Sequence, residues 1–361
     1  MKAIFRNLMV WILLLGLAVI SVPGHSETEK AQAPKEKASD RTDKANEDLK
    51  ALEKIKSSDI LVVPGSYDHV QDVLKAAQIP HTIVRPEELS RIPLDPKQML
   101  MINCPGNGID EKGIARIKAF VSEGGFLFTT DWALKHVLER AFPGIVQYNN
   151  HPTSDDVVRV EVKEKDNLLR FVMTEKSEPL WWLEGSSYPI RILDPKRVKV
   201  LITSKEMKSK YGEDPIAILF HYGDGRVFHL TSHFYLQRSE LRSQRQKKDA
   251  TSYVKGELGL NSPKAAPVAP DLQGLSTGGV ESAYTAQQFI ANVVVERKKS
   301  QGKSDSYHLT AKTPLYEKPD TVSRTLESLP EGSKLTVLKR EGDWRQVRTA
   351  SGKEGWIMQA P

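Results

Sequence analysis

The first apolar stretch of the chain runs from Leu8 to Val22. Lys2 and Arg6 precede it, and the small residues of Gly24–Ser26 follow it. A basic start, a short apolar run and small residues form the layout of a secretory signal peptide. The run of about 15 residues falls short of the roughly 20 that span a bilayer, although an uncleaved anchor is the alternative. We therefore predict a signal peptide over residues 1–26 and export to the periplasm or cell envelope, with membrane contact through this segment alone.

The next segment, residues 27–58, is rich in Lys, Glu, Asp and Ala and poor in large apolar side chains. Such a composition cannot bury a core, so a charged, solvated linker is predicted. The pattern changes at Asp59. Ile60–Val63 is a short continuous apolar run that ends at Pro64-Gly65, as expected of a strand buried on both faces.

Strands and helices then alternate. Further strands are predicted around Thr82–Val84, at Met99–Ile102 and at Phe126–Thr129, with a helix across Ile114–Val121. This alternation predicts an α/β domain over residues 59–298 with a doubly wound, mostly parallel sheet. In such sheets functional side chains gather at the carboxyl ends of the strands.

Two stretches interrupt or end this pattern. Residues 239–279 hold a basic cluster followed by a Pro-, Ala-, Gly- and Ser-rich run, which predicts a mobile insertion. Residues 299–305 are a polar linker. Beyond them, residues 306–361 form short apolar strands separated by glycine turns, which predicts a small all-β barrel.

The α/β segment resembles the class I glutamine-amidotransferase-like superfamily and its ThuA-like branch. The resemblance rests on Asn103–Gly106, on the helix and Gly124-Gly125 strand that follow, and on the late strand Gly223–Leu230. It implies a cysteine on a sharp turn after the strand at Phe126–Thr129, a histidine on a later strand, and an acid that orients this histidine.

This sequence departs from that pattern. The turn reads Thr129–Ala133 and holds no cysteine, and Tyr235 stands where the orienting acid is expected. Asp131 occupies the nucleophile's place and His233 matches the histidine. Two roles stay open for Asp131: an N-cap of the following helix, which is favoured, or an acid/base couple with His233. An enzyme is therefore not favoured, and these two residues are the only catalytic candidates.

The single cysteine, Cys104, excludes a disulfide within the chain. It lies at a strand end, where it could act as a substitute nucleophile, but a buried structural thiol is favoured. His229 and His233 are four residues apart on a predicted strand, which separates them by about 13 Å. One ion cannot bridge that distance, and further ligands are not evident, so no metal and no cofactor are predicted.

Aromatic side chains at the strand ends are the predicted ligand contacts of the α/β domain: Trp132, Trp182 and Tyr235. Trp181 and Trp182 are neighbours on a strand, and neighbours point to opposite faces. One of them is therefore expected in the core and the other at the surface.

The last segment resembles a bacterial SH3 domain. The matching residues are Leu315–Pro319, Glu331–Gly332, Gly342–Trp344 with Val347, and Gly355–Ile357. The resemblance implies a binding module, with peptidoglycan or an envelope protein as partner. Tyr316 and Trp344 are its predicted ligand contacts, whereas Trp356 is expected to pack the barrel.

The net charge of +6 is spread along the chain, so no dense basic stripe for nucleic acid is present. We predict an exported envelope protein with a non-catalytic, ligand-binding α/β domain and an SH3-like module for cell wall or peptide. The alternatives are a cell-wall hydrolase that uses Asp131 and His233, and an oligomerising scaffold protein.

Overall fold

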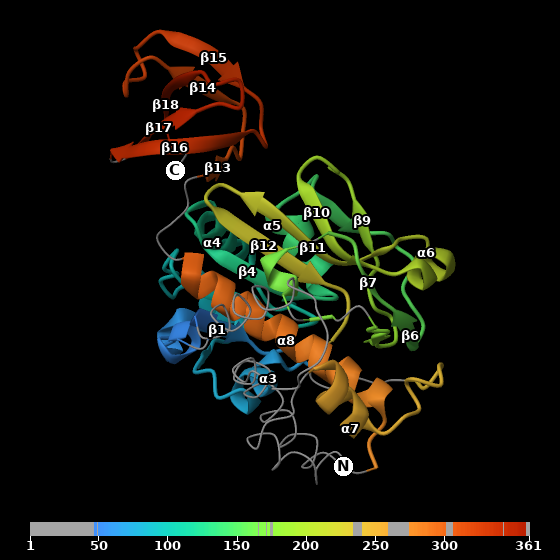
Figure 1. Cartoon of the computed structure of the whole chain (residues 1–361). Coiled ribbons are helices and arrows are strands. Elements are labelled where there is room, and N and C mark those ends of the chain that lie inside the picture. The colour runs from blue at the N-terminus through green and yellow to red at the C-terminus, as the bar shows by residue number, and fades with distance from the viewer. Residues whose placement is uncertain are drawn as a thin grey trace, which may run out of the picture.

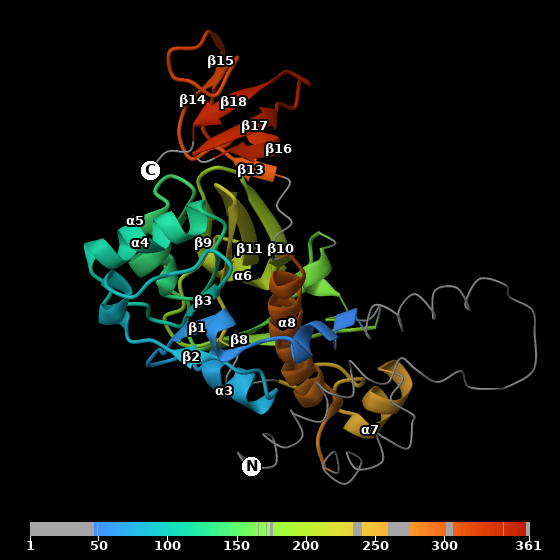
Figure 2. The same ribbon diagram turned by 90° about the vertical axis from the view of Figure 1, so that its left-hand side faces the viewer.

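The structure, a computed structural model, describes residues 47–48, 50–164, 166–170, 172–173, 176–233, 240–258, 274–300, 306–341 and 343–358. The predicted signal peptide and Tyr235 lie outside these residues. Figures 1 and 2 show an α/β domain with a β-barrel beyond one end of its sheet. None of the helices in the described ranges is both long and apolar enough to cross a membrane.

An eight-stranded sheet in the order β2-β1-β3-β4-β12-β11-β10-β7 forms the centre of the larger domain. Its parallel part comprises β2 (Thr82–Ile83), β1 (Ile60–Val63), β3 (Met99–Ile102), β4 (Phe126–Thr130) and β12 (Gly225–Leu230). Its antiparallel part comprises β11 (Pro215–Tyr222), β10 (Val198–Thr203) and β7 (Glu161–Val162). The predicted α/β class is thus confirmed, with a mixed sheet that contains a parallel part.

Alternate residues of the central strands face two separate apolar layers. Met101 and Phe128 belong to one layer, and Leu100 and Leu127 belong to the other. Because both faces are covered, these strands are apolar throughout, which explains their continuous apolar sequence.

Helices cover both faces of the sheet. Val73 of α3 (Val70–Ala76) and Phe289 of α8 (Thr277–Ser300) belong to one layer. The other layer includes residues of α4 (Glu111–Ser122), the π-helical turn η3 (Leu134–Leu138) and α5 (Glu139–Ala141). Asp110 caps α4 by accepting a hydrogen bond from the Gly113 amide.

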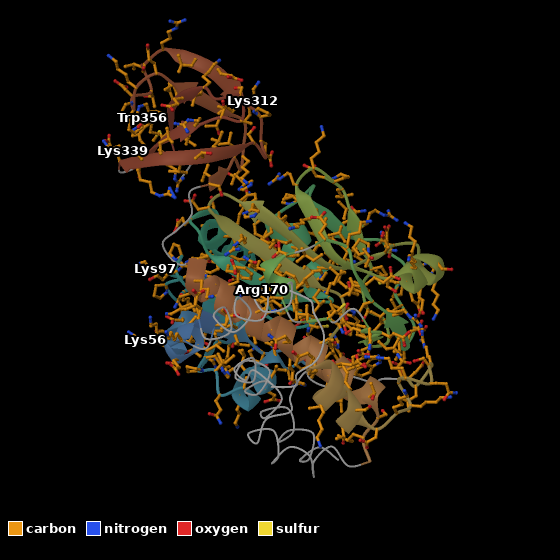
Figure 3. All side chains as sticks on the ribbon, in the orientation of Figure 1. Lys56, Lys97, Arg170, Lys312, Lys339 and Trp356 are labelled. Atoms are coloured by element: carbon orange, nitrogen blue, oxygen red, sulfur yellow. The ribbon has the colours of Figure 1, made fainter. Side chains whose placement is uncertain are left out.

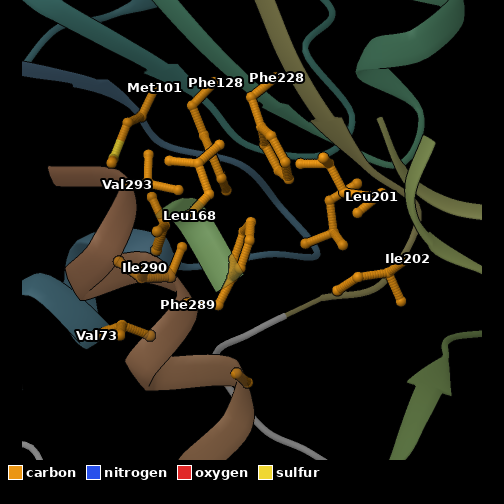
Figure 4. Close-up of a cluster of buried hydrophobic side chains, with 14 of the residues drawn as sticks. Val73, Met101, Phe128, Leu168, Leu201, Ile202, Phe228, Phe289, Ile290 and Val293 are labelled. Carbon is orange, nitrogen blue, oxygen red and sulfur yellow. The ribbon is translucent and has the colours of Figure 1, made fainter. Parts of the chain in front are cut away.

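Three phenylalanines show how tightly the first layer is packed (Figure 4). The rings of Phe128 and Phe228 stack with centroids 5.3 Å apart, and Phe289 of α8 approaches Phe228 to 4.9 Å. Truncating such a buried ring to alanine costs about 3–5 kcal/mol. The packing therefore fixes β4 and β12 side by side, which matters because both strands end at the candidate site.

Smaller elements surround the sheet. They are the strand pairs β5 (Val146–Tyr148) with β9 (Ile190–Ile192) and β6 (Asp156–Arg159) with β8 (Leu180–Leu183), helix α6 (Lys205–Tyr211), and the 3-10 turns η1 (Ser57–Asp59), η2 (Pro86–Ser90) and η4 (Asn167–Leu169). The segment after β8 crosses the carboxyl ends of the central strands and supplies side chains to the site.

The stretch predicted as a mobile insertion is packed where the structure describes it. It contains α7 (Ala250–Ser252) and the π-helical turn η5 (Tyr253–Glu257). Arg245 pairs with Glu257 at 2.6 Å and with the fully buried Glu281 of α8 at 2.8 Å. Residues 240–258 are therefore attached to α8, and residues 259–273 lie outside the described part of the chain.

The C-terminal barrel is a six-stranded antiparallel sheet in the order β13-β16-β17-β18-β14-β15. Its strands are β13 (Ser306–His308), β14 (Thr313–Tyr316), β15 (Thr325–Leu329), β16 (Lys334–Glu341), β17 (Trp344–Arg348) and β18 (Glu354–Met358). A small core fills it, with Leu315, Val347 and Ile357 fully buried. Figure 3 shows Lys312 and Lys339 on the barrel and Lys56 and Lys97 on the α/β domain.

The barrel is attached to the turn between β11 and β12. Gly223 and His308 exchange two backbone hydrogen bonds of 2.9 and 2.8 Å, and Arg345 contacts Asp224 at 2.5 Å. The His221 and His308 rings stack with centroids 4.3 Å apart. Because β12 begins at Gly225, this contact lies at the opposite end of the parallel strands from their carboxyl ends.

Candidate functional site

The candidate site lies where β3, β4 and β12 end. Asp131 follows β4 directly and has φ of +42°, a left-handed backbone conformation that side-chain-bearing residues seldom adopt. Asp131 as a whole is 2% exposed. A turn of this kind aims a side chain from the end of a strand, and here it directs a carboxylate into the interior rather than into solvent.

The Asp131 carboxylate is held by donors from the segment after β8. Oδ1 accepts from the Tyr188 amide at 2.7 Å, and Oδ2 accepts from the Ser187 hydroxyl at 3.0 Å. The π-helical turn that follows has no side-chain cap. The favoured interpretation of Asp131 as an N-cap is therefore wrong, because its carboxylate accepts from Tyr188 and Ser187 and contacts His233 instead of the first turn of the helix.

His233 lies between two carboxylates. Its Nε2 is 3.1 Å from Asp131 Oδ2, and its Nδ1 is 2.6 Å from Glu184 Oε2. Burial lowers the pKa of His233, but the hydrogen bonds with Asp131, Cys104 and Glu184 outweigh it and hold this pKa well above the usual value. Burial raises the pKa of Asp131, a change that His233, Tyr188 and Ser187 oppose.

Cys104 follows β3 and completes the cluster. Its thiol donates to Asp131 Oδ2 at 3.8 Å, and its amide donates to Thr130 Oγ1 at 2.9 Å. The residue is 1% exposed, and burial raises the pKa of the thiol to about 11. At neutral pH the thiol is protonated and closed off from solvent, as expected of a structural cysteine and not of a nucleophile.

Gly65, in the turn after β1, allows the close approach that buries Cys104. A Cβ atom at this position would lie 2.0 Å from the Cys104 carbonyl oxygen. Only glycine fits here without a shift of the backbone. The Pro64-Gly65 signal that ended the first strand in the sequence therefore also closes one wall of the site.

The arrangement has the connectivity of a catalytic relay. A side chain on a strained turn, Asp131, meets one nitrogen of His233, and an acid, Glu184, meets the other. A relay also requires access for substrate, and both Asp131 and His233 are nearly inaccessible. Only Glu184, whose side chain is 34% exposed, reaches the surface. The geometry shown can hold a proton or an ion between its groups but leaves no open position at the carboxylate.

An aromatic strip, defined by Tyr67, Trp132, Tyr188 and Tyr148, runs beside the buried cluster. Successive ring centroids are 5.5, 5.1 and 3.9 Å apart. Tyr67 is 51% exposed, Trp132 and Tyr188 are partly exposed, and Tyr148 is 8% exposed. Trp132 also donates through Nε1 to the Ser186 carbonyl at 2.6 Å. The strip is thus a fixed row of ring faces beside the carboxyl end of the central strand β4.

The other predicted contacts lie apart from the cluster. Trp182 is partly exposed and donates to Asp155, whereas Trp181 is fully buried and donates to Thr285 at 3.0 Å, so the two rings point to opposite faces as predicted. His229 is buried, with Nδ1 2.8 Å from Thr129 Oγ1. It does not join His233.

The barrel places its predicted contacts on its own surface. Tyr316 and Trp344 meet edge to face with centroids 5.6 Å apart, and both are partly exposed. Trp356 lies opposite Tyr316 on the paired strand and is also partly exposed, so it does not fill the barrel interior in the way Val347 does.

Sequence reasoning missed Glu184, Ser187 and Tyr188. They follow strand β8 within one short segment, but no spacing rule connects that segment to Asp131, more than fifty residues earlier. The available signal was the pair of tryptophans in β8, which marked a strand near the strand ends. The three residues lie beyond the paired part of β8, so the tertiary path of this segment decided which of them face the site.

Comparison with protein families gives one match. Residues 312–360 match the bacterial SH3 domain. This agrees with the barrel that the sequence predicted and with the antiparallel sheet that the structure shows. The SH3 domain covers the end of the chain only, and no curated protein matches the chain.

Comparison with solved structures gives distant likenesses. A putative ThuA-like protein from Parabacteroides merdae is 14% identical, with 62% of this chain and 91% of that chain covered and a TM-score of 0.35. One from Bacteroides uniformis is 12% identical, with coverages of 58% and 87% and a TM-score of 0.32. A β-galactosidase from Bacillus circulans sp. alkalophilus is 12% identical, with coverages of 93% and 45% and a TM-score of 0.39. The chain spans 31% to 45% of the length of the β-galactosidases it matches.

Proposed function

We propose that this protein is an exported cell-envelope protein that binds rather than cuts. Its α/β domain, of the glutamine-amidotransferase-like and ThuA-like kind, holds a ligand or partner, and its SH3 domain attaches it to cell wall or peptide. The observation that carries the proposal is the closure of the strand-end cluster. Cys104, Asp131 and His233 are each at most 3% exposed, and the Cys104 thiol is protonated at neutral pH.

The aromatic strip is the proposed binding surface of the α/β domain. Partly exposed rings held at fixed spacing offer flat apolar faces with polar edges, which suit the faces of sugar rings and aromatic groups. Trp132 is immobilised by its bond to Ser186 and by stacking on Tyr188. A pre-ordered surface loses little conformational entropy when a ligand binds. Polar side chains of the neighbouring cluster, including the partly exposed Glu184, supply hydrogen-bond partners for the ligand.

The SH3 domain is proposed to act as the second attachment point. Its contact with the α/β domain uses β13 and Arg345 of β17, whereas Tyr316, Trp344 and Trp356 remain partly exposed. Figure 3 shows Trp356 at the outer rim of the barrel. Two binding surfaces on opposite ends of one sheet can hold two partners, or two parts of one polymer, at once.

Retention on purified peptidoglycan tests the proposal. The wild-type chain should pellet with peptidoglycan, and a chain that ends before residue 306 should stay largely in solution. Trp344→Ala should lose retention in the same way while the melting temperature changes little. Val322→Ala is the matched control, because Val322 is an apolar barrel side chain that is 88% exposed and lies in the turn between β14 and β15. Equal partition of all four chains would contradict wall binding.

A second candidate function, a cell-wall hydrolase, is favoured by one observation. The order of Asp131, His233 and Glu184 is that of a nucleophile or acid, a base and its orienting group. If peptidoglycan or muropeptide turnover is found, Asp131→Asn and His233→Gln should each abolish it while the chain stays folded. Turnover that survives both substitutions would remove this candidate.

A further inference from the structure

The buried cluster combines three kinds of side chain that rarely meet without a reason. A thiol, a carboxylate and an imidazole come from the ends of β3, β4 and β12, and their ligand atoms all lie within 4.8 Å of one another. Asp131 Oδ2 is 3.1 Å from His233 Nε2 and 3.8 Å from Cys104 Sγ. We propose that Cys104, Asp131 and His233 form a three-ligand site for a divalent zinc-type metal ion.

The spacing of the donor atoms fits such an ion. Zinc binds sulfur at about 2.3 Å and nitrogen or oxygen at about 2.0–2.2 Å, which places neighbouring tetrahedral ligands about 3.3–3.6 Å apart. The two separations from Asp131 Oδ2, 3.1 Å to His233 Nε2 and 3.8 Å to Cys104 Sγ, bracket that range, and all three ligand atoms lie within 4.8 Å of one another. Small side-chain shifts would bring the three atoms to these separations around one ion.

The surroundings supply the outer contacts that metal ligands need. A histidine that binds metal through one nitrogen usually donates its other N–H to a carboxylate. His233 does so, with Nδ1 2.6 Å from Glu184 Oε2 and Nε2 turned toward the cluster. The ligating carboxylate is oriented in turn by the Tyr188 amide and the Ser187 hydroxyl. Each ligand side chain is thus already aimed at a common point.

The donor types select the class of metal. A thiolate with an imidazole favours zinc and similar borderline ions over magnesium and calcium, which prefer oxygen ligands. Binding converts the Cys104 thiol to a thiolate and removes the Nε2 proton of the charged His233 ring, and both protons leave to solvent. The three buried ligands would hold the ion at the ends of three strands, with the fourth tetrahedral position left to a small ligand such as water. This inference does not depend on the ligand-binding role proposed above.

Cobalt substitution tests the inference on the intact wild-type protein. After treatment with a chelator, Co(II) should produce visible tetrahedral bands and a near-ultraviolet thiolate-to-cobalt charge-transfer band that saturate at one ion per chain. Because Cys104 is the only cysteine, that charge-transfer band can come from no other site. Zinc should displace it. A folded chain that shows no charge-transfer band with cobalt and retains no zinc after expression in zinc-supplemented medium overturns the proposal.

Variants locate the site more closely. Cys104→Ser should remove the charge-transfer band, and Glu184→Gln, which alters only the group behind His233, should weaken zinc binding about 10–100-fold. His151→Gln is the matched control, since His151 is exposed and outside the cluster, and it should bind as the wild type does. A folded Cys104→Ser chain with wild-type zinc affinity also overturns the proposal. If that variant does not fold, the wild-type cobalt spectrum still decides.

Discussion

The two ends of strand β12 hold buried ionisable groups for different purposes. At its carboxyl end, His233 meets Asp131, Glu184 and Cys104, all from the α/β domain. At its amino end, Asp224 meets Arg345 of the barrel. The first cluster joins strands and a crossing segment within one domain. The second joins two domains.

The two clusters differ in whether a charged group that loses its partner can be hydrated without unfolding of a domain. The Asp131 carboxylate of the strand-end cluster can reach water only if the domain opens. Asp224, on the tip of a hairpin, reaches water as soon as the barrel moves away. Its side chain is 8% exposed and that of Arg345 is 7% exposed in the attached state. Loss of a partner should therefore unfold the α/β domain at the carboxyl end of β12 and separate the two domains at its amino end.

The largest effect is expected at the carboxyl end. Asp131→Ala leaves the Tyr188 amide, the Ser187 hydroxyl and the His233 imidazole without their shared acceptor. Loss of one partner from a buried charged pair costs about 3–5 kcal/mol. Chemical denaturation should show that decrease in the free energy of unfolding. Asp72→Ala, at an exposed position of α3, should change it by less than about 0.5 kcal/mol. A stable Asp131→Ala chain would mean that water already enters the cluster.

The next effect concerns the amino end. Arg345→Ala removes the cation of the buried pair and the contact of its guanidinium with the Tyr307 ring, 4.3 Å away. We expect the barrel to detach, with a loss of up to about 3 kcal/mol, because hydration of Asp224 limits the cost. Small-angle scattering should show a larger radius of gyration while both domains stay folded. Arg348→Ala, on the same strand but paired with the exposed Glu354, is the control and should leave the shape unchanged.

Acidic pH should weaken the same contact between the barrel and the α/β domain. Burial lowers the pKa of His221 to about 3 and that of His308 to about 4, and nearby positive charges, including Lys334, add to both shifts. Since both values lie below the unfolded value of 6.5, the stability that the neutral rings contribute is present above pH 6.5. It is lost as the pH falls from 6.5 toward 4. Proteolysis between the domains, followed against pH, should accelerate across that window, and His308→Gln should reduce the dependence. A flat profile would contradict the attachment seen here.

The smallest effect is expected on the aromatic strip. Tyr67 stands at its exposed end and contacts Trp132 alone among the rings of the strip. An aromatic pair contributes about 0.5–1.5 kcal/mol beyond its buried area, so Tyr67→Ala should lower stability by no more than about 1.5 kcal/mol. If the strip binds the ligand, the same variant should lose affinity for it. A large loss of stability would show that Tyr67 belongs to the core.

Much of the fold could be predicted from the sequence, because local patterns determine it. Continuous apolar runs at Ile60–Val63 and Met99–Ile102 indicated buried strands, and glycine turns with Gly355–Ile357 indicated the barrel. Both appear in the structure. The antiparallel part of the sheet, β11, β10 and β7, was not predicted. Strand direction depends on pairing between distant segments, and apolar content alone does not encode it.

The candidate site shows the same division. The sequence alone placed Asp131 and His233 at strand ends, because their positions after apolar strands fix that much. Only the tertiary structure decided that Asp131 faces inward to meet Cys104 and His233, and that Glu184 replaces the missing acid. Those contacts join residues that are 27 to more than 100 positions apart. Side-chain direction there follows from one positive φ angle and from the path of the segment after β8, and neither leaves a periodic signal in the sequence.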